Sequence, residues 1–166
     1  MATALFISRT DLVKNTIIDG NVDTDKFIQF IKIAQEIHIT NYLGSKLYDK
    51  ISADIVANTL TGDYLSLVKD FIQPMLIHFA MVEYLPFASF QIKNGGVFKH
   101  SSENAESISK SEIEFLVQKE RNTSEYYTRR FVDYICFNGN KFPEYNTNQD
   151  SDVRPEKDTK PSNWVL

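Results

Sequence analysis

The residues best suited to acid–base or metal chemistry are the three histidines of the chain. His38 falls on the apolar face of a predicted helix, where an imidazole more often makes a core or interface hydrogen bond than binds a metal. His78 precedes Glu83 by five residues. Five steps of about 100° put them on different sides of a helix, so they cannot share a metal ion. His100 has no acidic residue at a useful spacing, and we predict neither a metal site nor a cofactor.

The possible nucleophiles form no catalytic motif either. Cys136 is the only cysteine, so it cannot form an internal disulfide, and its apolar neighbours predict a buried structural thiol. There is no nucleophile-elbow sequence, and the glutamates between 112 and 125 indicate a solvated helix face. We therefore expect no enzyme and no catalytic residues. A small hydrolase or nuclease, with a site assembled from distant segments around His38 or His78, is the less favoured alternative.

One cluster, Tyr126-Tyr127 with Arg129-Arg130, contains the residue types that bind nucleic acid or acidic partners. On a helix these side chains point to different sides, so we favour a protein interface or an intrachain ion pair over contact with DNA. The charge balance agrees with this. Eighteen Lys and Arg against 22 Asp and Glu give a net charge of −4, which argues against a surface that binds phosphates broadly.

The composition indicates one globular domain with an appended tail. The chain has 166 residues, of which 42% are hydrophobic, and this is enough to build a core. Aromatic residues make up 13%, so some rings are expected at contacts with partners. No apolar run approaches the roughly 20 residues that cross a bilayer, and we expect no membrane association.

The elements that would position these residues are mostly helices. Ser8 and Asp11 predict a capped helix over residues 9–16, and apolar residues at three- and four-residue spacing predict a second helix from Asp23 to Gly44. Further helices are expected from Ser45, over residues 64–85, and over residues 111–137 with a capping box of Ser111 and Glu114. Pro74 either kinks its helix or begins a new one, and residues 111–137 form either one helix or two. The fold class is mainly α: a bundle of about five helices with one β-hairpin and an extended C-terminal arm.

The hairpin is predicted over residues 90–100, within a helical domain that spans residues 1–140. A three-residue loop would pair Ile92 with Phe98 and Phe90 with His100. The arm, residues 141–166, has three prolines and no sustained period, and its removal should leave a folded domain. The predicted contact residues lie in these two segments: Phe90, Ile92, Lys93, Asn94, Gly95, Gly96 and Phe98 in the hairpin, and Phe142, Tyr145, Trp164, Val165 and Leu166 in the arm.

Four short motifs follow one another along the N-terminal half. They are Phe6-Ile7-Ser8 with Asp11-Leu12, Asn21-Val22-Asp23, Ile31 with Ala34-Gln35, and Tyr42-Leu43-Gly44 with Leu47-Tyr48 and Ile51. In this order they resemble the head–tail connector proteins of tailed phages, in particular the ring proteins of crAss-like phages. The pattern extends over residues 5–100.

The resemblance implies a structural virion protein, made in the host cytoplasm, that forms a homo-oligomeric ring at the head–tail junction. Such rings are typically twelve-fold, bind the portal protein and adjacent tail or ring proteins, and let DNA pass non-specifically through their lumen. The family has no catalytic residues to transfer. The alternative is a helical protein-binding or regulatory module without catalytic activity, docking through residues 126–134.

Overall fold

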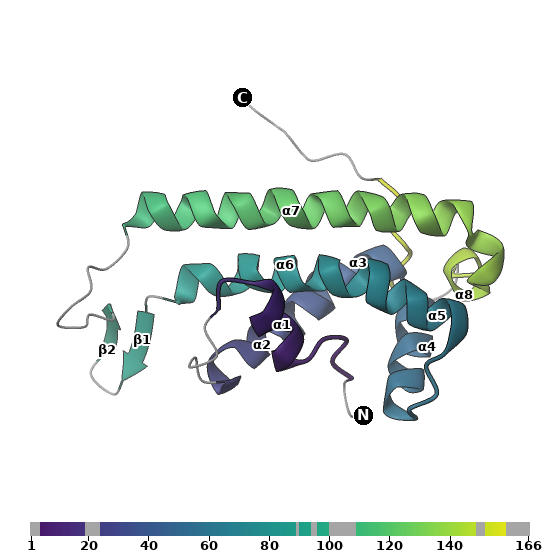
Figure 1. Cartoon of the computed structure of the whole chain (residues 1–166), viewed down its shortest axis with the longest axis horizontal. Helices are drawn as coiled ribbons and strands as arrows, with labels where there is room; N and C mark the ends of the chain where they lie inside the picture. Colours follow the sequence, from purple (N-terminus) through teal and green to yellow (C-terminus); the bar gives the residue numbers. More distant parts are fainter. Residues whose placement is uncertain are drawn as a thin grey trace.

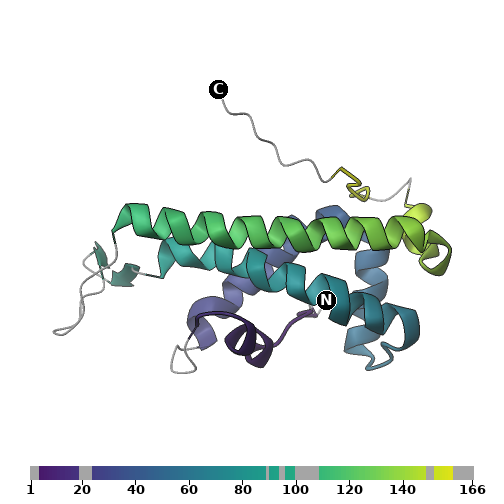
Figure 2. The same ribbon diagram turned by 45° about the horizontal axis from the view of Figure 1, so that its top comes forward.

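The computed structural model describes residues 4–18, 24–88, 90–93, 96–99, 109–148 and 152–158. Within them the chain is mainly helical, as predicted (Figure 1). α6 and the longer α7 lie side by side and antiparallel, and α1 and α2 pack against α6 on the side away from α7 (Figures 1 and 2). The helices are α1 (Arg9–Asn15), α2 (Thr24–Ala34), α3 (Thr40–Leu43), α4 (Ser45–Val56), α5 (Gly62–Leu67), α6 (Gln73–Tyr84), α7 (Lys110–Phe137) and α8 (Pro143–Asn146).

The first helices begin and end where the sequence indicates. The side chain of Ser8 accepts a hydrogen bond from the amide of Asp11, and the Asp11 carboxylate accepts one from the Ser8 amide, which completes the predicted capping box of α1. α2 continues through a π-helical segment, Gln35–Ile39, into α3. Gly44 ends α3 at φ 73° and ψ 159°, a conformation that essentially only glycine adopts.

The helix that contains Pro74 is one continuous rod with a local π-turn. The π-helical segment Val68–Ile72 joins α5 to α6, and Pro74 lies in the first turn of α6. Pro74 thus lies at the start of α6, near the predicted alternative that it begins a helix, and the wider turn before it accommodates the missing N–H without interrupting the rod. A 3-10 turn, Leu85–Phe87, extends the rod to its end.

That rod, Gly62–Phe87, is the one helix in the described part of the chain that is long and apolar enough to cross a membrane by length and composition. The sequence analysis predicted that no apolar stretch approaches the length that crosses a bilayer, and so it overlooked this helix. Within this fold, 56% of the most apolar stretch of the rod is buried, and α6 packs against both α2 and α7. It is therefore the central helix of the core.

α7 is a single helix of 28 residues, which settles the choice between one helix and two. Its capping box is formed by Ser109 and Glu112, two residues before the predicted pair. Ile135 is fully buried, whereas Cys136 is exposed, so the prediction of a buried thiol was wrong. Successive helical residues are about 100° apart, and an inward Ile135 turns the next side chain outward.

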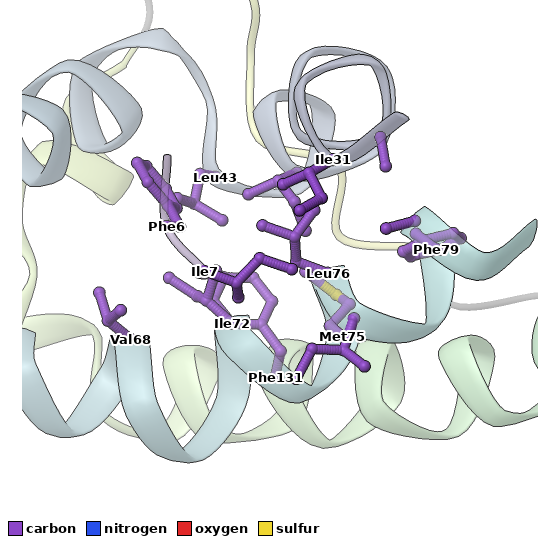
Figure 3. Close-up of a cluster of buried hydrophobic side chains, with 14 of the residues drawn as sticks. Phe6, Ile7, Ile31, Leu43, Val68, Ile72, Met75, Leu76, Phe79 and Phe131 are labelled. Atoms are coloured by element: carbon purple, nitrogen blue, oxygen red, sulfur yellow. The ribbon is translucent and has the colours of Figure 1, made fainter. Parts of the chain in front are cut away.

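The core lies where α6 is sandwiched between α2–α3 and α7. Ile31 and Leu43 approach α6 from one side, and Phe131 of α7 approaches from the other (Figure 3). Leu76 has no exposed surface. Ile7 packs in the same cluster, so the N-terminal segment is part of the core.

Two strands, β1 (Phe90–Lys93) and β2 (Gly96–Lys99), pair antiparallel beyond the ends of α6 and α7 (Figure 1). The register pairs Phe90 with Lys99 and Ile92 with Val97, so the predicted pairings of Phe90 with His100 and of Ile92 with Phe98 were wrong. Two residues rather than three separate the strands, and Asn-Gly is the preferred sequence for a two-residue connection.

In the described part of the chain after Asn140, residues 141–148 pack into the domain, which corrects the prediction that an extended arm begins at residue 141. A 3-10 turn, Gly139–Lys141, leads into α8. Phe142 and Tyr145 are 0% and 2% exposed, so they are core residues and not contacts for partners. Sequence patterns failed here because four-residue helices show no helical period.

Candidate functional site

The predicted contact residues that the structure describes do not come together in one place. The hairpin lies at one end of α6 and α7, and α8, which contains Tyr145 and directly follows Phe142, lies at the other (Figure 1). Ile92, Lys93, Gly96 and Phe98 belong to the paired strands. Asn94, Gly95, Trp164, Val165 and Leu166 fall outside the described residues.

Exposed aromatic rings mark the base of the hairpin. Phe90 is 48% exposed, and Phe87 at the end of the preceding turn is 59% exposed. The Phe87 ring stacks on Phe30 of α2, with centroids 5.5 Å apart, and Phe30 in turn contacts Tyr84 edge-on. Sequence reasoning missed Phe87, although its position directly after Pro86 at a helix end was a usable signal.

At the opposite end, a backbone clasp holds the C-terminal segment 152–158. The amide of Val153 donates to Oγ of Ser45 at 2.8 Å, and the Val153 carbonyl accepts from the Ser45 amide at 2.9 Å. The amide of Glu156 donates to the carbonyl of Asn41 at 2.8 Å. A Cβ on Gly44 would lie 2.7 Å from Cδ of Pro155, so glycine is required for this close approach.

A partly open apolar groove of about 540 Å³ lies between the N-terminal segment, α2, the end of α4 and the α5–α6 rod. Its lining includes the apolar side chains of Phe6, Ile7, Phe27, Ile55 and Val68. Its position depends on the N-terminal segment, which side chains of two other helices hold in place.

Gln35 and Gln73 hold the N-terminal segment. The fully buried Gln35 accepts from the amide of Phe6 at 2.8 Å and donates to the carbonyl of Ala4 at 2.7 Å. Gln73 donates to the carbonyl of Phe6 at 2.7 Å. These bonds satisfy backbone groups that no neighbouring strand pairs, so the segment runs through the core without a sheet.

Two histidine–glutamate pairs tie α6 to its neighbours. Nε2 of His38 lies 2.9 Å from Oε1 of Glu83, and Nδ1 of His78 lies 2.7 Å from Oε2 of Glu120. Each imidazole also stacks on an aromatic ring, His38 on Phe79 with centroids 4.1 Å apart. His38 makes the kind of structural hydrogen bond that was predicted for it. His78 pairs with Glu120 and not with Glu83, from which the helix geometry separates it. No group of three metal-ligating side chains occurs among the described residues.

Burial raises the pKa of several tyrosines around the clasp. It is the main cause of the raised pKa of Tyr145, and of the raised pKa of Tyr42 beside Glu156. The pKa of Tyr64 is raised first by burial and then by its hydrogen bond to Glu144, whose carboxylate oxygen lies 2.6 Å away. A raised pKa keeps each phenol protonated and therefore neutral, which suits a side chain that packs in the protein interior.

The guanidinium of Arg130 lies over the rings of Phe71 and Tyr127. Its central carbon is 5.4 Å from the Phe71 centroid and 5.9 Å from the Tyr127 centroid. Because Arg130 packs on aromatic rings of its own chain, we favour an intrachain role for it over contact with nucleic acid. Tyr126, the neighbouring aromatic residue, remains 58% exposed.

A model of a family of unknown function, DUF6712, matches residues 39–155. The chain belongs to the DUF6712 family. No curated protein and no solved structure matches the chain.

The DUF6712 match ends at Pro155, the residue that packs on Gly44 in the clasp. The family unit therefore includes α8 and the first part of the clasped segment, residues 152–155, beyond the predicted domain boundary at residue 140. Nothing in the sequence pattern pointed to the clasp or the two histidine–glutamate pairs, since each joins residues that are far apart in the chain.

Proposed function

We propose that this DUF6712 protein is a structural subunit of a phage virion, which forms a ring at the junction of portal and tail. The ring would contain about twelve copies, bind the portal and the adjacent tail or ring proteins, and surround the DNA conduit. The subunit would act through packing, without catalysis and without membrane association. This function rests on the resemblance of residues 5–100 to connector proteins.

The structural observation that carries the proposal is the hairpin with its exposed aromatic base. β1 and β2 extend beyond the helical body, and Phe87 and Phe90 leave apolar surface uncovered there. A projecting hairpin of this kind suits insertion against a neighbouring subunit, where it would gain the packing that two strands alone lack.

The groove and the charge of the chain also support the ring. The groove beside Phe6 and Phe27 would receive apolar side chains of the next copy, as expected for a head-to-tail interface. A net charge of −4 suits a conduit, because few phosphate contacts would retain the DNA. The apolar residues Trp164, Val165 and Leu166, which lie outside the described residues, would contact a neighbouring protein.

Binding to purified portal protein from the same genome tests the proposal. Replacing both Phe87 and Phe90 by serine should weaken ring formation on the portal at least tenfold, because it removes the uncovered apolar surface. Val56→Ser is the matched control, since Val56 is 62% exposed at the end of α4. If the wild-type protein does not bind portal, or if the double variant binds as well as Val56→Ser, the proposal is wrong.

A further inference from the structure

The outer face of α7 carries three exposed aromatic side chains in one line. Phe115, Tyr126 and Phe137 are 69%, 58% and 88% exposed. They are spaced by 11 residues, which is three helical turns plus about 20°, so they share one face. The buried residues of α7, such as Phe131, lie on the other side.

This aromatic line is open to a partner. α7 lies at the edge of the bundle, and no other described helix covers its outer side in either view (Figures 1 and 2). The clasped C-terminal segment docks elsewhere, on Asn41 and Ser45. The line therefore remains uncovered by the described part of the chain.

Two oppositely charged residues of the same face lie symmetrically about Tyr126. Lys119 lies seven residues before Tyr126 and Asp133 lies seven residues after it. Both are exposed, and neither forms an ion pair within the described residues. Phe115 and Phe137 are likewise equidistant from Tyr126.

Such a pattern fits a second copy of the same face, turned end for end. With Tyr126 at the two-fold axis, Phe115 of each copy meets Phe137 of the other, and Lys119 meets Asp133. A parallel arrangement would instead oppose Lys119 to Lys119 and Asp133 to Asp133. Like charges in contact disfavour that alternative.

We infer that two copies of the free protein associate through the outer faces of α7, antiparallel, with Tyr126 at the symmetry axis. The contact would extend about 33 Å from Phe115 to Phe137, at 1.5 Å per residue. It has two aromatic pairs at its ends, one at its centre, and two ion pairs between them. This inference goes beyond the ring, whose head-to-tail contacts use different surfaces of the subunit.

Disulfide trapping tests the symmetry directly. In a full-length Cys136→Ser background, Tyr126→Cys should form a disulfide-linked dimer under mild oxidation, because the two positions face each other across the axis. Lys119→Cys in the same background is the matched control. Its two copies would be about 21 Å apart along the helices, too far for a disulfide.

Charge exchange tests the register. Lys119→Glu should weaken dimerisation in sedimentation velocity at least tenfold, and adding Asp133→Lys should restore it. The inference is overturned if the wild-type protein is monomeric at all concentrations, or if Tyr126→Cys links no better than Lys119→Cys. It is also overturned if Tyr126 is protected only when a different protein is bound, since the face would then serve an unrelated partner.

Discussion

Val153 and Ser45 are joined by two hydrogen bonds that link residues 108 positions apart. The pair fixes the C-terminal segment to the first turn of α4, directly after Gly44. Because Ser45 uses both its amide and its hydroxyl here, the start of α4 serves as the attachment point for the end of the family unit.

Replacing Gly44 by alanine should release this attachment. The substitution forces a side chain into a backbone conformation that favours glycine, and its Cβ would lie 2.7 Å from Pro155. We expect a loss of about 3 kcal/mol in the free energy of unfolding, measured by urea denaturation. Gly62→Ala is the control, because Gly62 also has positive φ but nothing within 4 Å, and should cost about 1 kcal/mol. Equal losses in the two variants would contradict the tight packing at Gly44.

Truncations should locate the true end of the folded unit. Removing residues 159–166 should change the free energy of unfolding by less than about 0.5 kcal/mol, since the clasp is retained. Removing residues 141–166 takes Phe142 and Tyr145 out of the core and should abolish cooperative thermal unfolding, because losing one buried phenylalanine alone costs about 3–5 kcal/mol. A cooperative transition in the longer truncation would show that the core does not need α8.

Gln35→Leu should destabilise the protein by about 2–4 kcal/mol. The leucine leaves the amide of Phe6 and the carbonyl of Ala4 buried without partners, although it fills a similar volume. Gln73→Leu removes a single bond, to the Phe6 carbonyl, and should cost about 1 kcal/mol. Urea denaturation of both variants gives the comparison, and a smaller loss for Gln35→Leu would contradict the role of Gln35.

The tyrosines around the clasp predict a loss of stability at alkaline pH. A raised pKa means that the native state holds the phenolic proton more tightly than the unfolded chain. The resulting stability is therefore complete below the ordinary value of 10.0 and is lost as the pH rises above it. Urea midpoints measured between pH 8 and pH 11 should fall steeply above pH 10. Constant midpoints would contradict the buried, protonated state.

Replacing two of these tyrosines by phenylalanine should change the free energy of unfolding in opposite directions. The Tyr145 hydroxyl is buried without a hydrogen-bond partner among the described residues, so Tyr145→Phe should raise the free energy of unfolding by about 1 kcal/mol. Tyr64→Phe loses the bond to Glu144 and should lower it by about 1 kcal/mol. The same sign in both variants would contradict the difference between the two sites.

The sequence predicts features that depend on local chemistry. The Ser8 capping box and the end of α3 at Gly44 are encoded by neighbouring residues, and periodicity identifies the long helices. Contacts between distant segments have no such signal. The pairing of His78 with Glu120 depends on how α6 and α7 align, and the burial of Phe142 depends on a helix too short to show a period. The exposure of Cys136 depends on the rotation of α7 against α6, which a short apolar run does not specify.

The most direct test of the proposed function is the copy number of this protein in virions. If the chain is a phage protein, as we propose, quantitative mass spectrometry of the purified particles of its phage should find it at about one copy per portal subunit. Its absence from the particles, or an abundance unrelated to that of the portal, would contradict the role as a connector ring.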